Sequence, residues 1–373
     1  MTDDNTLQAD CVEGAPHPRE TTLLLGQDKA QSSFLTAYNS GRLHHAWLIT
    51  GPRGVGKATL AWKIARFLLA EPTKDGSMFT DPLPAPGMLD ISVDHPILRH
   101  VATLGEPRLF LCRRPWDDKT KRHKRDITVE ETRALKTFFQ MSATDGGWRV
   151  AIVDAADEMN NSAANALLKI LEEPPEKTII LMISHQPARL LPTIRSRCRE
   201  LRCDKLNSEN LSLALQNADF EIGQAPETLA ELADGSVGEA IRIMAQDGLK
   251  LYADLVGLAV QAPQMDRPTA LKLANACAGK GNEAVYDLTL RLTRQMLARI
   301  ARYAALQPSK LQEAAIGEAI LLSKLGPNPQ AAHKWANLLA TLTARSGHAR
   351  SVNLDPSSVI LDMLLKINET ARD

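Results

Sequence analysis

A glycine-rich segment that ends in a lysine is the first part of the chain that could do chemistry. Residues 51–58 read Gly-Pro-Arg-Gly-Val-Gly-Lys-Ala and follow an apolar run that ends at Thr50. Glycines let backbone N–H groups turn inward around a phosphate, and Lys57 adds a positive charge where a helix is predicted to begin. Strand, loop and helix in this order are typical of the P-loop, a nucleotide-binding motif. Its candidate phosphate-binding residues are Gly51, Gly54, Gly56 and Lys57.

The residue after Lys57 departs from a P-loop that supports hydrolysis. A Ser or Thr there would bind Mg²⁺ through its hydroxyl, but the residue is Ala58. Thr59 follows, about 100° further around the helix, so its hydroxyl is expected to point elsewhere, although it remains a candidate nucleotide-binding residue. Because Mg²⁺ neutralises the charge that develops in phosphoryl transfer, the loss weakens the case for hydrolysis but not the case for binding.

A second apolar run, over residues 150–153, ends at the carboxylate of Asp154. An acidic residue at the end of a buried strand can hold Mg²⁺, so Asp154 is a further candidate nucleotide-binding residue. The alternative is that Asp154 only caps the turn after the strand. The next residue is Ala155, where ATP-hydrolysing proteins of this type usually carry a glutamate that polarises water. Asp157 and Glu158 lie beyond the strand end and do not obviously replace it.

These residues are positioned by short apolar runs that alternate with amphipathic stretches over residues 21–203. Such alternation predicts an α/β domain with a parallel sheet, whose strands are buried on both faces. The predicted strands cover residues 47–50, 150–153 and 178–183. Beyond Cys203 the strand signals largely stop, and periodic Leu, Ile and Ala predict helices, one of them over residues 226–233.

The composition excludes several classes of function. Lys and Arg number 44, as do Asp and Glu, so the net charge gives no whole-chain case for nucleic-acid binding. The five cysteines are scattered and show neither a disulfide framework nor the spacing of a zinc site. The N-terminus is polar, and no apolar run reaches the roughly 20 residues that a bilayer requires, so we expect a cytoplasmic location without membrane contact.

Two segments are unusual in composition. Residues 71–106 contain five prolines, with Pro107 directly after them, and predict a long surface excursion with few regular elements. Residues 113–125 are strongly basic. This segment could contact phosphates, but Asp117 and Asp118 dilute its charge, and a solvated loop is the alternative.

Two further segments carry a family resemblance. Residues 165–175 read Asn-Ala-Leu-Leu-Lys-Ile-Leu-Glu-Glu-Pro-Pro, and residues 193–198 read Thr-Ile-Arg-Ser-Arg-Cys. Together with residues 43–48 and the pair Gly26 and Gln27, they resemble the signature segments of bacterial DNA polymerase III clamp-loader subunits, a branch of the AAA+ proteins. The resemblance covers residues 21–241, and the helical remainder is compatible with it.

This resemblance implies an AAA+ P-loop domain with a parallel sheet, a small helical lid and an all-α C-terminal collar domain. We expect a flexible leader at 1–20, the P-loop domain at 21–205, the lid at 206–262 and the collar at 263–373. Many family members carry a four-cysteine zinc module after the P-loop helix. Here the proline-rich segment takes that place without cysteine, so we expect no zinc.

The family contains ATP-hydrolysing subunits, gamma and tau, and a non-hydrolysing one, delta-prime. Three departures favour the non-hydrolysing type: Ala58, Ala155, and Gly238, which stands where hydrolysing subunits carry the sensor-2 arginine. Arg197 is retained, and the resemblance implies that it acts in trans as an arginine finger on the ATP of a neighbouring subunit. Without the flanking motif, Arg197 would be interpreted as a surface ion pair.

The resemblance therefore implies a stator subunit with no ATPase activity of its own, within a DNA-directed DNA polymerase assembly. The alternative is an active AAA+ ATPase motor subunit of the gamma/tau type. The implied partners are gamma/tau and delta subunits and, through them, the sliding clamp and primer-template DNA. No cofactor is expected to be required, and ATP binding is expected to be weak or vestigial.

Overall fold

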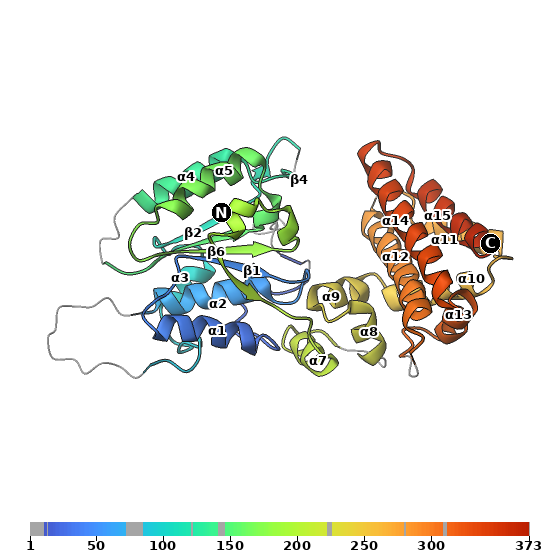
Figure 1. The fold of residues 1–373 in the computed structure, drawn as a ribbon, viewed down its shortest axis with the longest axis horizontal. Helices are drawn as coiled ribbons and strands as arrows, with labels where there is room; N and C mark the ends of the chain where they lie inside the picture. Colours follow the sequence, from blue (N-terminus) through green and yellow to red (C-terminus); the bar gives the residue numbers. More distant parts are fainter. Residues whose placement is uncertain are drawn as a thin grey trace. The chain divides into compact units, whose positions relative to one another are not determined.

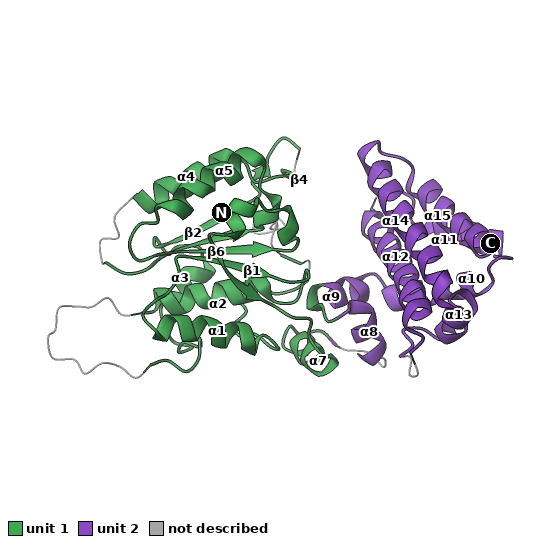
Figure 2. Cartoon of the chain, in the orientation of Figure 1, with its two compact units in different colours: residues 1–220, 235–238 green, residues 221–234, 239–373 purple. Residues whose placement is uncertain are grey.

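The structure is a computed structural model that describes residues 11–12, 14–71, 85–120, 122–140, 146–221, 226–279, 281–308 and 312–372. The chain divides into two compact units (Figure 2). Unit 1 comprises residues 1–220 and 235–238, and unit 2 comprises residues 221–234 and 239–373. The finer division into leader, P-loop domain, lid and collar stays a prediction. Within the described ranges, no helix has both the length and the apolar character needed to span a bilayer.

Unit 1 is built on a five-stranded parallel sheet with the order β2-β5-β6-β1-β7. The strands are β1 (Ala46–Thr50), β2 (Leu109–Arg113), β5 (Arg149–Asp154), β6 (Thr178–Ser184) and β7 (Arg199–Arg202). All residues of β1, β5 and β6 are buried, which agrees with their continuous apolar sequence. The predicted α/β class and these three strands are confirmed. The two edge strands, β2 and β7, were not predicted.

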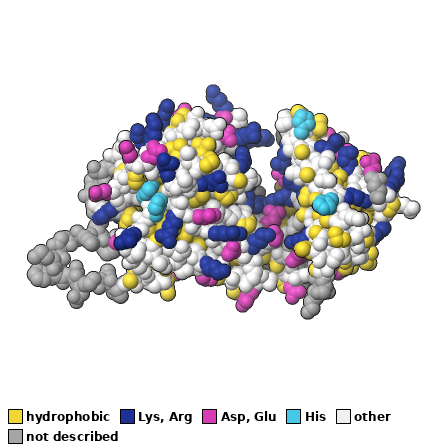
Figure 3. All heavy atoms as spheres, viewed as in Figure 1, with side chains coloured by type: hydrophobic (Ala, Val, Ile, Leu, Met, Phe, Trp, Pro, Cys, Tyr) yellow, Lys and Arg dark blue, Asp and Glu magenta, His cyan; other side chains and the backbone are white. Residues whose placement is uncertain are grey.

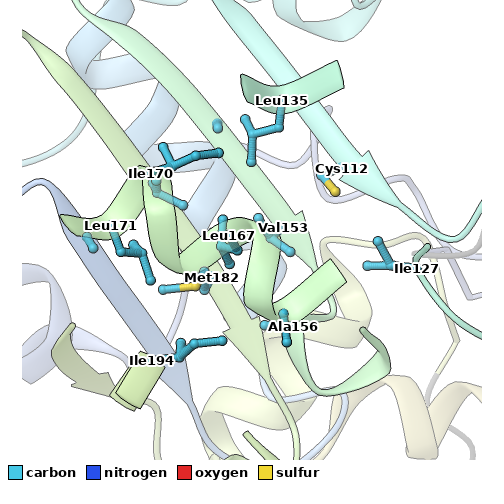
Figure 4. Packing of buried hydrophobic residues seen from close by; sticks show 14 of the residues in the cluster. Cys112, Ile127, Leu135, Val153, Ala156, Leu167, Ile170, Leu171, Met182 and Ile194 are labelled. Atoms are coloured by element: carbon cyan, nitrogen blue, oxygen red, sulfur yellow. The ribbon is translucent and has the colours of Figure 1, made fainter. Parts of the chain in front are cut away.

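Helices cover both faces of this sheet (Figure 1). One face carries α4 (Val129–Gln140) and α5 (Asn161–Glu172), and the other carries α1 (Asp28–Asn39), α2 (Lys57–Leu69) and α3 (Ile97–Ala102). Shorter elements of unit 1 are η1 (Ala156–Glu158), η2 (Pro187–Arg189), α6 (Pro192–Arg195) and α7 (Ser208–Gln216). The layers bury a cluster that includes Leu167 of α5, Val153 of β5 and Met182 of β6 (Figure 4). Burying each such side chain contributes roughly 1.5–3 kcal/mol.

The structure describes parts of the proline-rich segment 71–106 and of the basic segment 113–125. In the proline-rich segment, residues 72–84 lie outside the described residues; the remainder is mostly exposed, but it contains α3 and is anchored by the buried side chains of Leu89 and Val101. In the basic segment, β3 (Trp116–Asp117) pairs antiparallel with β4 (Arg122–His123). On the face of unit 1 drawn in Figure 3, basic side chains are interspersed with acidic ones.

The described elements of unit 2 are helices. They are α8 (Pro226–Ala233), α9 (Val237–Ala245, whose first two residues belong to unit 1), α10 (Gly248–Val260), α11 (Arg267–Ala276), α12 (Glu283–Leu306), α13 (Glu318–Leu325), α14 (Pro329–Ser351) and α15 (Pro356–Thr370). The predicted helix over residues 226–233 is confirmed as α8. Its Glu231 carboxylate pairs with Arg299 of α12, so α8 packs with the later helices of unit 2.

Candidate functional site

The P-loop connects β1 to α2 and depends on glycine for its shape. Gly51, Gly54 and Gly56 have φ angles of 141°, 77° and 100°, a region that favours glycine. A Cβ atom on Gly54 would also collide with the side chain of Ser236. The three glycines that the motif predicted are therefore required by the backbone, and the loop opens α2 at Lys57 as expected.

Lys57 folds back onto its own loop. Its Nζ donates to the carbonyl oxygen of Gly51 at 2.7 Å and also to that of Pro52. The side chain is buried, and burial lowers the pKa of Lys57 to about 8, although the charges of Asp154 and Asp157 partly oppose this shift. Two of the three N–H donors of the ammonium group are thus engaged within the loop.

The end of β5 brings the second set of predicted residues to the same edge of the sheet. Asp154 is the last residue of β5, and the buried Ala155 follows it without a side chain that could polarise water. Asp157 accepts a hydrogen bond from the backbone N–H of His185 at 2.9 Å. Glu158 pairs with Arg53 of the P-loop at 3.2 Å. Asp157 and Glu158 thus lie in the site, although their carboxylates are already engaged in these contacts.

His185 is a residue of this site that sequence reasoning missed. It follows β6, which lies between β1 and β5 in the sheet, so it reaches the edge where the P-loop begins. Burial, together with the positive charges of Lys57 and Arg53, lowers the pKa of His185 to about 4, so its ring is neutral at pH 7. The polar pair of Ser184 and His185 after an apolar strand was the available signal.

The departure at Gly238 also falls in this site. The N–H of Gly238 donates to the carbonyl oxygen of Gly54 at 3.4 Å, within unit 1. Backbone therefore lies against the P-loop at the position where hydrolysing clamp-loader subunits were expected to carry an arginine. The site contains the glycines and the lysine of the predicted motif, but Ala58, Ala155 and Gly238 supply no side chain for metal binding, water activation or phosphate contact.

Arg197 lies outside this constellation. It follows α6 in the segment between β6 and β7, and its side chain is 38% exposed. Its Nη2 lies 2.9 Å from Oε1 of Glu172, the last residue of α5, and its Nη1 donates to the carbonyl oxygen of Thr193 at 3.1 Å. Among the contacts of the described residues, none joins Arg197 to the P-loop.

Thr59, the remaining candidate nucleotide-binding residue, is half-buried on α2.

In the part of the chain that the structure describes, no group of three or more His, Cys, Asp or Glu side chains is arranged to hold a metal ion.

The α/β part of the chain is similar to known protein sequences. Residues 26–207 match the family model described as DNA polymerase III, delta subunit. Subunit delta' of DNA polymerase III from Pseudomonas aeruginosa is 34% identical over 216 residues, which are 57% of this chain and 59% of that protein. Subunit tau from Escherichia coli is 28% identical over 278 residues, which are 73% of this chain and 40% of that protein.

The chain thus spans less than two thirds of the length of either relative. A gamma-subunit-related protein of Thermotoga maritima, known as a crystal structure, aligns with 91% of this chain and 100% of its own at 16% identity, with a TM-score of 0.38. The family model matches residues 26–207, and this range contains the P-loop and the signature segments at 165–175 and 193–198. Residues 26–207 therefore match the family described as DNA polymerase III, delta subunit, and the resemblance to subunit delta-prime is confirmed.

Proposed function

We propose that the chain is a non-hydrolysing stator subunit of the replicative clamp loader, which loads the sliding clamp on primed DNA. In this role it assembles with gamma/tau and delta subunits in the cytoplasm, and it meets the clamp and primer-template DNA through them. It donates Arg197 to the ATP site of the neighbouring subunit. The observation that carries the proposal is the contrast between a half-exposed Arg197 in an intact motif and a P-loop site without its own catalytic side chains.

The chemistry of the P-loop site and that of Arg197 both support the proposed roles. Phosphoryl transfer needs a bound Mg²⁺ and an oriented water, and the positions for both functions are occupied by alanine, Ala58 and Ala155. A guanidinium that reaches a γ-phosphate stabilises the charge of the transition state whichever subunit supplies it. The chain thus serves a neighbouring active site while its own is inactive.

Nucleotide binding by this chain is weak or vestigial in the same proposal, and no zinc is required. The glycines are intact, but Lys57 already donates to two carbonyl oxygens of its own loop. Calorimetric titration with ATP, with and without Mg²⁺, tests this. Since Ala58 cannot bind the metal, the affinity should not depend on Mg²⁺, and a strong Mg²⁺ requirement would refute this part.

The main experiment substitutes Arg197→Ala in the reconstituted complex and measures ATP hydrolysis stimulated by DNA and clamp. An arginine finger contributes roughly 10³–10⁵-fold in some GTPases. We expect a smaller loss, because the other ATP sites of the assembly keep their own fingers. Arg195→Ala is the matched control, since Arg195 is an exposed arginine two residues earlier in the same segment.

The result is interpretable only with an assembled complex, which gel filtration verifies. Unchanged ATP hydrolysis and clamp loading by a fully assembled Arg197→Ala complex would refute the finger. ATP turnover near 1 s⁻¹ by the isolated chain, abolished by Lys57→Ala, would instead support the alternative, an active gamma/tau-like motor.

A further inference from the structure

Arg197 is held by two acceptors that come from different segments of unit 1. Glu172 Oε1, at the C-terminal end of α5, lies 2.9 Å from Nη2, and the carbonyl oxygen of Thr193 accepts from Nη1 at 3.1 Å. Two contacts on two nitrogens fix both the position and the plane of a guanidinium group, because the group is planar and rigid. The two signature segments, 25 residues apart at these positions, thus meet in one ion pair.

Both ends of this ion pair rest on anchored backbone. Helix α5 is capped by Asn160, whose side chain accepts from the N–H of Ala163 at 2.9 Å, and it buries Leu167 and Leu171 in the core (Figure 4). On the other side, Ile194 is fully buried and its carbonyl oxygen accepts from the N–H of Arg197 at 3.1 Å. The Glu172 carboxylate is therefore presented to Arg197 from a fixed place.

The ion pair leaves Arg197 able to bind a further anion. A guanidinium has five N–H groups, and the two contacts involve one each on Nη1 and Nη2. The two side chains are 38% and 49% exposed, so water screens their attraction. A contact of this kind orders the side chain without neutralising it, and an ordered group loses less entropy when it meets a phosphate.

We propose that Glu172 is a positioning residue for Arg197, which orients the guanidinium before it reaches the ATP of the neighbouring subunit. This inference rests on the proposed finger function of Arg197. Glu172 itself touches no nucleotide in this proposal and acts only through the arginine.

The test replaces Glu172 in the reconstituted complex and measures kcat and KM for DNA- and clamp-stimulated ATP hydrolysis. Glu172→Gln keeps the shape of the side chain and removes its charge, and we expect kcat to fall about two- to fivefold, as an exposed ion pair allows. KM for ATP should not change, because the neighbour's P-loop binds the nucleotide. Glu172→Asp should restore part of kcat. Glu173→Gln, at the adjacent exposed glutamate, is the matched control and should match the wild type.

A double-substitution cycle separates positioning from a structural role. In the Arg197→Ala background, Glu172→Gln should cause no further loss, because the residue it positions is absent. An equal further loss there would show that Glu172 acts on the structure, and would overturn the inference. A normal or raised kcat of Glu172→Gln alone, beside a lowered kcat of Arg197→Ala, overturns positioning and leaves the finger standing. An Arg197→Ala complex with normal activity overturns both.

Discussion

Two arginines of the chain pair with glutamates in opposite surroundings. In unit 2, the Arg299 side chain is 5% exposed, and its Nε lies 2.6 Å from Glu318, which is fully buried. The remaining nitrogens of Arg299 contact Glu231 and the carbonyl oxygen of Gln312. In unit 1, the Arg197 side chain is 38% exposed and has one carboxylate and one carbonyl oxygen as partners.

The difference shows how surroundings decide what an arginine can do. A buried charge must have its hydrogen-bonding groups satisfied, so Arg299 is surrounded by acceptors from its own unit. Burial by itself lowers the pKa of Arg299, but the hydrogen bonds and charge of Glu318 outweigh this and raise it. Arg299 thus serves the fold, whereas Arg197 keeps N–H groups outside its two contacts and an exposed surface.

The largest expected effect is in unit 2. Glu318 accepts hydrogen bonds from Arg299, the Tyr252 hydroxyl and the N–H of Ala314. Glu318→Ala leaves the buried Arg299 without its main counterion, and we expect the free energy of unfolding to fall by about 3–5 kcal/mol. Urea unfolding followed by circular dichroism measures the loss, and hydrogen exchange of peptides from α12 and α13 locates it.

An exposed ion pair of the same unit is the control. Asp362 lies 2.8 Å from Arg345, and both side chains are more than a third exposed. Asp362→Ala should lower the free energy of unfolding by less than about 1 kcal/mol. If both variants lose the same amount, burial does not govern the stability of these pairs and the comparison fails.

The same physical distinction explains what the sequence could reveal. β1, β5 and β6 were predictable because burial on both faces leaves a continuous apolar run. β7 was not, because Leu201 is its one buried residue and charged side chains surround it.

In the candidate site, the P-loop glycines and Lys57 are local in sequence and were found as a motif. His185, Asp157 and the contact of Glu172 with Arg197 depend on which strands and helices lie side by side. Local motifs and hydrophobic periodicity do not show which elements become neighbours, so these contacts emerged only from the fold.

A half-buried base close to the positive charges of Lys57 and Arg53 should respond to pH, unlike Arg299 with its buried glutamate. The pKa of His185 is about 4 in the folded state, below its ordinary value of 6.5. Between these values the unfolded chain binds a proton that the folded chain does not. The folded state therefore loses stability as pH falls from 6.5 to 4, by up to about 1.4 kcal/mol per pH unit.

Comparing the wild type with His185→Asn isolates this contribution, because other titrating groups are common to both. Urea unfolding at pH 6.5, 5.5 and 4.5 should show the wild type losing more stability than the variant at each step. The backbone N–H that donates to Asp157 is retained in the variant. A difference between the two proteins that is independent of pH would show that His185 is not held neutral.

The smallest expected effect on stability is at Arg197, and it completes the comparison. Its partner Glu172 is 49% exposed, so water replaces the lost ion pair, and Arg197→Ala should change the free energy of unfolding by no more than about 0.5–1 kcal/mol. Urea unfolding of the isolated chain measures this, with Arg195→Ala as the matched variant. A loss approaching that of Glu318→Ala would mean that Arg197 holds unit 1 together, and a loss of complex activity could then no longer be assigned to a finger. A small loss of stability beside a clear loss of ATP hydrolysis would separate the two roles, because a side chain that contributes little to its own fold has its effect through the neighbouring subunit.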